Sequence, residues 1–131
     1  MADFLLVHDA ACDAPVHVEI YPDGSLRRAF PEEHQLRYRR AISVRVLGLG
    51  ELSPPHGPAM TTLWDVLRDM RQRYPSIRLA AHRQVRGVEV ICPGTDFPFA
   101  QLKTWWEKDL EAEAAARFDA LLASAYVPRL D

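Results

Sequence analysis

The chain has 131 residues, which is enough for one domain with a single core and too few for two. Its hydrophobic content of 48% and charged content of 26% are typical of a folded globular protein and argue against a disordered chain. The net charge of -2 argues against a general electrostatic affinity for nucleic acid, and no apolar run reaches the length of a membrane span.

The N-terminal residues and the two cysteines indicate a cytoplasmic protein. The first residues lack the basic start, long apolar centre and cleavage site of a signal peptide. A disulfide between Cys12 and Cys92 remains open on the sequence alone. In a reducing compartment, however, we expect Cys92 to serve as a thiolate ligand and Cys12 to be a buried or free thiol.

The first half of the chain predicts four short strands with alternating or continuous apolar patterns: Asp3–His8, Val16–Tyr21, Ser25–Phe30 and Ala41–Leu47. The segment Pro22–Gly24 has turn composition and should join the second and third strands in a hairpin. The Gly- and Pro-rich segment Gly48–Gly57 predicts a loop.

The second half predicts two helices separated by a strand. The first helix should begin near Pro58, a favourable first-turn residue, and end at Tyr74, before a proline. Ile77–Ala81 predicts a strand that leads directly to His82. The second helix should fill Phe99–Tyr126, as one long helix or as two with a bend, because its apolar residues keep helical spacing.

Three side chains with metal-ligating chemistry follow apolar runs or turns. His8 ends the first predicted strand, His82 follows a later one, and Cys92 precedes Pro-Gly on the way to the second helix. Two imidazoles and one thiolate suit a catalytic zinc ion with one vacant position, whereas a structural zinc site normally has four protein ligands. Taken alone, His8 fits a core histidine and Cys92 a small buried hydrophobe, so the prediction depends on all three.

Three motifs in the segment Ile77–Lys108 carry a family resemblance: AAHRQV, ICPG and DFPFAQLKTWW. They resemble the zinc-dependent N-acetylmuramoyl-L-alanine amidases, a family that includes phage endolysins and peptidoglycan-recognition proteins. Upstream, FLLVHDAA, VHVEIYPDGSL and RAISVRVLG are similar to the first strand, the hairpin and the next strand of the family. The resemblance implies one Zn²⁺ held by His8, His82 and Cys92, and a peptidoglycan or muropeptide substrate.

The resemblance also implies an α/β fold with a single mixed central β-sheet flanked by helices. We expect one amidase-like domain over residues 1–131, with the resemblance over 4–108 and a C-terminal helical extension over 109–131. About eight residues separate His8 from His17, so the family's helix between the first two strands should be missing. Because its loss would expose apolar surface, we expect Glu107–Tyr126 to cover the sheet or to mediate a homodimer or another protein contact.

The usual proton-transfer groups of the family are absent. By resemblance, its catalytic tyrosine and lysine fall on Val16 and Val90, and a glutamate of some members falls on Arg45. Amide hydrolysis still requires proton transfer and oxyanion stabilisation. The remaining catalytic candidates are four polar residues, each of which also fits a solvated strand or loop position: His17, Glu19, Arg45 and Glu89. For His17, a hydrogen-bonded strand histidine is the better interpretation.

Two functions therefore remain open. The first is an N-acetylmuramoyl-L-alanine amidase, a hydrolase of an amide bond, with reduced or lost activity. The alternative is a non-catalytic peptidoglycan- or protein-binding domain of the same fold. Neither nucleic acid nor a membrane is expected as a partner. A cytoplasmic chain would meet the cell wall after release during phage lysis, or would act on wall fragments inside the cell.

Overall fold

The computed structural model describes residues 2–47, 57–95 and 97–125. The chain divides into two compact units, Met1–Phe99 and Ala100–Asp131. The first unit contains the sheet and the first helix, and the second contains almost all of the last helix. Most of the loop predicted at Gly48–Gly57 lies outside the described residues, and so does Tyr126.

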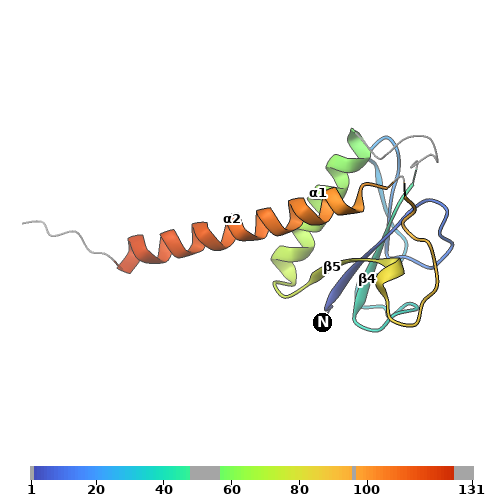
Figure 1. Ribbon diagram of the computed structural model, residues 1–131, viewed down its shortest axis with the longest axis horizontal. Helices are drawn as coiled ribbons and strands as arrows, with labels where there is room; N and C mark the ends of the chain where they lie inside the picture. The colour runs from blue at the N-terminus through green and yellow to red at the C-terminus, as the bar shows by residue number, and fades with distance from the viewer. Residues whose placement is uncertain (1, 48–56, 96, 126–131) are drawn as a thin grey trace, which may run out of the picture. The chain divides into compact units, whose positions relative to one another are not determined.

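Five strands form one mixed sheet with the order β3-β2-β4-β1-β5 (Figure 1). β1 pairs in parallel with β4 and with β5, β2 pairs in parallel with β4, and β3 is antiparallel to β2. The strands are β1 Phe4–His8, β2 Val18–Ile20, β3 Leu26–Arg28, β4 Ala41–Val46 and β5 Arg78–Ala81. The predicted strands and the mixed sheet are confirmed, although β2 and β3 are shorter than predicted.

The connections around the first two strands also agree with the sequence. Between β1 and β2, residues 9–17 form turns and contain no helix, as predicted. The β2–β3 hairpin turns at Gly24, whose φ of 88° lies in the left-handed region that glycine favours. Asp23 stabilises this turn because its Oδ1 accepts a hydrogen bond from the Ser25 N–H at 2.9 Å.

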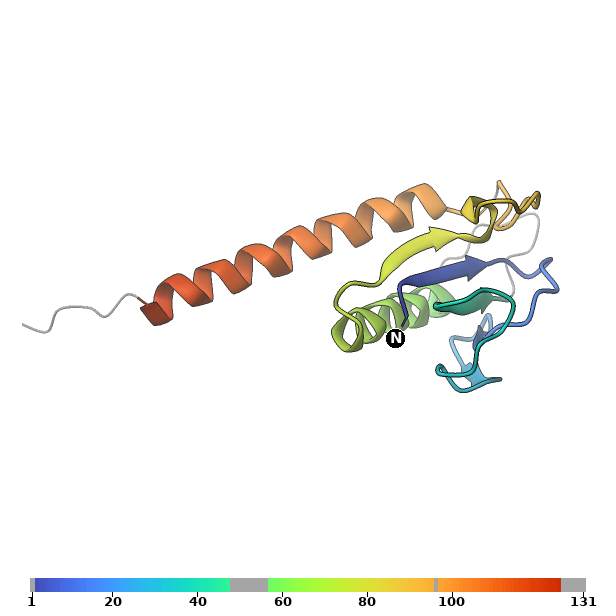
Figure 2. The ribbon, with the colours of Figure 1, turned by 90° about the horizontal axis from the view of Figure 1, so that it is seen from below.

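Helix α1, Pro58–Arg73, covers one face of the sheet (Figures 1 and 2). It begins with proline in its first turn and ends just before the predicted Tyr74. Successive residues of a strand point to opposite faces, so alternate residues of the central strands point to the face that this helix covers. The apolar residues that form this core are almost fully buried: Leu63, Leu67 and Met70 of the helix, and Leu5, Val7, Ile42 and Val44 of the strands.

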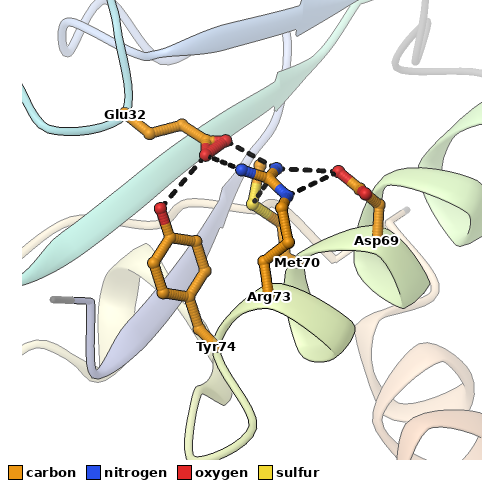
Figure 3. A network of polar contacts seen from close by, with 5 residues as sticks. All are labelled: Glu32, Asp69, Met70, Arg73 and Tyr74. Carbon is orange, nitrogen blue, oxygen red and sulfur yellow. Dashed lines mark hydrogen bonds and ion pairs between the residues drawn. The ribbon is translucent and has the colours of Figure 1, made fainter.

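A polar network ties the segment after β3 to the C-terminal end of α1 (Figure 3). The Glu32 carboxylate accepts hydrogen bonds from the Arg73 guanidinium, at 2.6 Å from one of its nitrogens, and from the Tyr74 hydroxyl at 3.2 Å. Arg73 also donates to Asp69 at 2.7 Å. These bonds to Arg73 hold the pKa of the Glu32 carboxyl below its usual range. The network therefore fixes one end of the segment 29–40, which also carries Tyr38.

The second unit consists mainly of helix α2, Phe99–Ala125, which is a single continuous helix. Phe118 and Leu122 of this helix are 61% and 53% exposed. The expected role of this extension, covering the sheet or mediating association, stays a prediction. Within the described parts of the chain, neither helix has the length and apolar character needed to cross a bilayer.

Candidate metal centre

Two buried histidines stand at the carboxyl edge of neighbouring strands. His8 is the last residue of β1, and His82 follows β5 directly and begins the short 3₁₀ helix η1, His82–Gln84. β1 and β5 are parallel neighbours, so their carboxyl ends meet at the same edge of the sheet, where α/β proteins commonly place their sites. Both side chains are almost inaccessible to solvent, which brings two imidazoles into one enclosed position.

Cys92 is brought to the same place by a loop that is fastened at two points. The Arg83 N–H donates to the Cys92 carbonyl at 2.7 Å, and the Gly94 N–H donates to Asp9 Oδ2 at 2.6 Å. A β-carbon at position 94 would lie 3.2 Å from that Asp9 oxygen, so the close approach favours glycine. Cys92 itself is buried. His8, His82 and Cys92 thus converge on one position from β1, the end of β5 and the later loop, and their role as metal ligands stays a prediction.

Cys12 is a free, partly exposed thiol, and it also lies in this cluster, a position that the sequence did not lead us to expect. The chain turns directly after β1, because the Cys12 N–H donates to the Asp9 carbonyl at 3.2 Å and the Ala11 N–H donates to Asp9 Oδ1 at 3.2 Å. The turn returns Cys12 Sγ to 3.4 Å from His8 Nδ1 and 3.4 Å from His82 Nδ1. The spacing of four residues between His8 and Cys12 is the sequence signal that could have indicated it.

The four donor atoms have the spacing of a metal site. Besides the two contacts of Cys12, Cys92 Sγ lies 3.8 Å from His8 Nδ1, and one ligand atom from each of the four residues lies within 4.8 Å of the others. Tetrahedral zinc with Zn–N of about 2.1 Å and Zn–S of about 2.3 Å sets neighbouring ligand atoms about 3.4–3.8 Å apart. Imidazole and thiolate are also the donors that zinc prefers. The residues therefore fit a zinc ion.

The electrostatic environment keeps the imidazoles neutral and the thiol protonated in the absence of metal. Burial, together with the nearby His82 and Arg45, lowers the pKa of His8 to about 3. Burial, with a smaller effect of Arg37, also lowers the pKa of His82. Burial raises the pKa of Cys92 to about 12, and the neighbouring Cys12 adds to this effect. Neutral imidazoles offer free lone pairs, whereas the thiol must lose its proton when it binds a metal.

The two histidines differ in their outer hydrogen bonds. Nε2 of His82 and the Tyr38 hydroxyl are hydrogen-bonded at 2.6 Å, and Tyr38 reaches this position from the segment that Glu32 and Arg73 anchor. Nε2 of His8 is buried and has no hydrogen-bond partner among the described residues. Such outer contacts orient a metal-binding histidine and fix its tautomer. Tyr38 is a residue that the sequence analysis did not identify.

His17 has a structural position rather than a free catalytic one. Its Nδ1 accepts a hydrogen bond from the Ser43 N–H at 3.0 Å, and its Nε2 donates to the His34 carbonyl at 2.7 Å. The ring is fully buried. Both nitrogens are therefore occupied, which leaves none to transfer a proton and agrees with the interpretation as a hydrogen-bonded strand histidine.

Of the other catalytic candidates, Arg45 lies beside the cluster and Glu89 makes no contact with it. Arg45 pairs with His8 in the β1–β4 register, but its guanidinium is bound to Glu19 at 3.3 Å and to the Ala14 carbonyl. Glu89 is exposed on the loop before Cys92 and makes no hydrogen bond or ion pair with any described residue. The structure thus brings Arg45 next to the cluster, already held in an ion pair with Glu19, and gives Glu89 no contact with it.

The positions expected for the family's tyrosine and lysine have no polar chemistry. Val16 is buried, 2% exposed, beside the structural His17, and Val90 is 40% exposed on the loop before Cys92. Neither side chain can donate or accept a proton. The edge of the sheet therefore combines a well-formed donor cluster with few groups that could assist hydrolysis.

Comparison with solved structures identifies the fold. No protein-family model matches the sequence, and no curated protein matches it. N-acetylmuramoyl-L-alanine amidase LysC from Clostridium intestinale URNW is 22% identical, with a TM-score of 0.68 over 81% of this chain and 85% of its own. A selenomethionine derivative of AmpD is 17% identical, with a TM-score of 0.62 over 79% of this chain and 83% of its own.

A third match is the Ph2119 endolysin from Thermus scotoductus MAT2119 bacteriophage Ph2119. It is 15% identical, with a TM-score of 0.58 over 72% of this chain and 78% of its own. At identities of 15–22% the likeness is one of fold. The mixed sheet, the helices and the order of the elements therefore give this chain the fold of the N-acetylmuramoyl-L-alanine amidases.

Proposed function

We propose that this chain is a zinc-binding domain of the N-acetylmuramoyl-L-alanine amidase fold that recognises muropeptides and whose amidase activity is reduced or lost. The observation that carries the proposal is the convergence of His8, His82 and Cys92 at one edge of the sheet, with spacings that suit zinc. In an open site, zinc acts as a Lewis acid and lowers the pKa of bound water.

The residues around the cluster support low activity. A general acid or base contributes roughly 10²- to 10⁴-fold to a hydrolysis rate, and one oxyanion donor roughly 10²- to 10³-fold. His17 has both ring nitrogens in backbone hydrogen bonds, and Val16 and Val90 carry no polar group. Without these contributions, we expect turnover at least about 10⁴-fold below that of an amidase with a complete site.

A pocket on the face that carries the cluster supports the choice of ligand. It has a volume of about 420 Å³, and Tyr38, Arg39, Gln84 and Arg86 are among its lining residues. Tyr38 connects the pocket to His82 through its hydroxyl. The peptide stems of muropeptides carry carboxylates, and arginine is well suited to bind them through paired hydrogen bonds. We therefore assign the peptide stem to this pocket.

A second candidate function is protein binding. It is favoured by the exposure of Phe118 and Leu122 on α2, because large exposed apolar side chains commonly mark association sites. Light scattering and thermal melting of the full chain and of a chain that ends at Leu110 test it. A monomer with an unchanged melting temperature in both forms would exclude a homodimer and a stabilising role of the extension.

Binding and hydrolysis of a muramyl peptide should be measured on the same zinc-loaded protein. Calorimetry reports binding, and mass spectrometry of the products reports cleavage between the sugar lactyl group and L-alanine. We expect binding that Arg39→Ala and Arg86→Ala weaken at least about tenfold each, since each removes a charged hydrogen bond. Arg117→Ala on α2 is the matched control and should bind like wild type. Absence of binding by wild type would refute muropeptide recognition.

A further inference from the structure

We infer that Cys12 is a fourth protein ligand, so that His8, Cys12, His82 and Cys92 form a closed metal centre with a structural role. The inference rests on the proposed function in one respect, namely that the cluster binds zinc. It differs from the three-ligand site that the family resemblance implies, because it adds a residue that the resemblance leaves out.

The position of Cys12 is the first argument. Its sulfur is equidistant from the two imidazoles, at 3.4 Å from Nδ1 of His8 and 3.4 Å from Nδ1 of His82. These distances match the separation of about 3.6 Å between a nitrogen and a sulfur ligand of tetrahedral zinc. The contact to His82 spans 70 residues of sequence, so it depends on the fold and not merely on local geometry.

Ordinary hydrogen bonding explains this arrangement less well. A thiol carries one proton and is a weak donor, so Cys12 can donate to only one of the two imidazoles that it contacts. His8 Nδ1 is also approached by the second thiol, that of Cys92, at 3.8 Å. Four buried or half-buried polar groups thus converge with few strong hydrogen bonds among them, which is costly without a further partner. A single metal ion would satisfy all four.

The number of ligands decides the role of the site. Catalytic zinc keeps three protein ligands and one open position, whereas structural zinc is closed by four. Two imidazoles and two thiolates from this chain would leave no open position for water or for an amide carbonyl. Loss of hydrolytic activity is indicated independently by Val16 and Val90, because valine cannot transfer a proton at these two positions. A closed centre and the missing proton-transfer groups would therefore both prevent amide hydrolysis.

A closed centre would also have a stabilising task. It would join the end of β1, the turn at residues 9–12, the start of η1 and the loop at Cys92, which the sequence separates by up to 84 residues. A metal that binds the folded state and not the unfolded one stabilises the fold by its binding free energy. Tyr38, which is hydrogen-bonded to His82, also lines the proposed muropeptide pocket, so the metal would help to hold this pocket in shape.

The chain contains two cysteines in total, so a count of bound thiolates tests the inference directly. Cobalt(II) should be substituted into wild type and into Cys12→Ser, with Cys92→Ser as the matched variant. We expect a tetrahedral spectrum whose sulfur-to-cobalt charge-transfer intensity falls by about half in each variant, because each loses one of two thiolates. The zinc affinity of each variant should fall by roughly 100-fold or more. Loss of a residue that only hydrogen-bonds to a metal ligand already lowers metal affinity by about 10- to 100-fold, and loss of a direct ligand should cost at least as much.

A second measurement uses the wild-type protein alone and does not depend on the folding of a variant. In the zinc-loaded protein, iodoacetamide should modify neither cysteine, and removal of zinc with EDTA should make the partly exposed Cys12 reactive. Rapid alkylation of Cys12 while zinc stays bound, or a Cys12→Ser spectrum equal to that of wild type, would overturn the inference and leave zinc binding intact. Failure of wild type to bind either metal would overturn both.

Discussion

The hydroxyl of Tyr38 lies 2.6 Å from Nε2 of His82, while Nδ1 of the same ring lies 3.4 Å from Cys12 Sγ. Nε2 of His82 is therefore held by a hydrogen bond, and Nδ1 points into the cluster of donor atoms. Outer contacts of this kind set the orientation and the tautomer of a metal-binding histidine. Tyr38 is held in turn by the segment that Glu32 attaches to α1.

Replacement of Tyr38 by Phe should weaken zinc binding by roughly 10- to 100-fold, because His82 loses the group that orients it. Competition with a coloured zinc chelator measures the change. Tyr74→Phe is the matched control, because its hydroxyl donates to Glu32 and does not contact the cluster. Equal zinc affinity of Tyr38→Phe and wild type would show that the contact does not orient the ligand.

Asp9 should stabilise the turn and the loop on which the two cysteines lie. Its carboxylate accepts from the Gly94 N–H at 2.6 Å and from the Ala11 N–H at 3.2 Å. Asp9→Ala should lower the free energy of unfolding by about 1–3 kcal/mol, and Asp9→Asn should lose less because it keeps an acceptor oxygen. Urea denaturation measures both. The exposed Asp13 in the same loop offers the control Asp13→Ala, and an equal effect of the two alanine variants would refute the role of Asp9.

The Glu32–Arg73 pair should give the protein a pH-dependent stability. Arg73 lowers the folded-state pKa of Glu32 below its ordinary value of 4.5. The pair therefore stabilises the fold fully above pH 4.5, and this contribution is lost as the pH falls through the lower folded-state pKa.

The pH effect is measured as the difference in unfolding free energy between wild type and Glu32→Gln. We expect a difference of about 1 kcal/mol near pH 6, because Arg73 is partly exposed, and a smaller one near pH 3. Glu33→Gln, at the exposed neighbouring position, should show little difference at either pH. A Glu32→Gln effect that is constant over this range would mean that the carboxylate charge does not contribute.

His17 should affect stability far more than metal binding. His17→Ala removes an acceptor for the Ser43 N–H and a donor to the His34 carbonyl, and it leaves a cavity in the core. We expect a loss of about 2–4 kcal/mol in unfolding free energy, with one zinc ion per chain retained at temperatures where the variant is folded. Nitrogen NMR of the wild-type ring should show one fixed tautomer with the proton on Nε2. A mixture of tautomers in the wild-type ring, or loss of zinc from the folded variant, would contradict this role.

The strands and α1 could be predicted because their hydrophobic patterns and end residues favour these elements locally. The alternating pattern of Ala41–Val46 predicts a strand with one buried face. The continuous apolar run before His8 predicts a strand that is buried on both faces. Pro58 and the proline after Tyr74 mark the ends of α1. The shorter β2 and β3 were not predictable, because their ends depend on which partner residues are available.

The metal cluster was predictable only in part. His8, His82 and Cys92 stand at strand ends or beside Pro-Gly, where position alone suggests a site. Tyr38 gave no such signal, and Cys12 gave only its spacing of four residues from His8. Cys12 reaches the cluster because Asp9 turns the chain directly after β1, and Tyr38 reaches His82 because Arg73 fixes a distant part of its segment. The contacts of both residues with His82 depend on long-range folding, which no local pattern in the sequence records.

The most direct test of the account is the zinc content of the full chain, purified without a metal-affinity tag and compared with Cys92→Ser. The account predicts one zinc ion per wild-type chain, and much weaker retention by the variant when a chelator competes. Complete absence of zinc from the folded wild-type protein, even after reconstitution with the metal, would contradict it and would leave only the fold in common with the amidases.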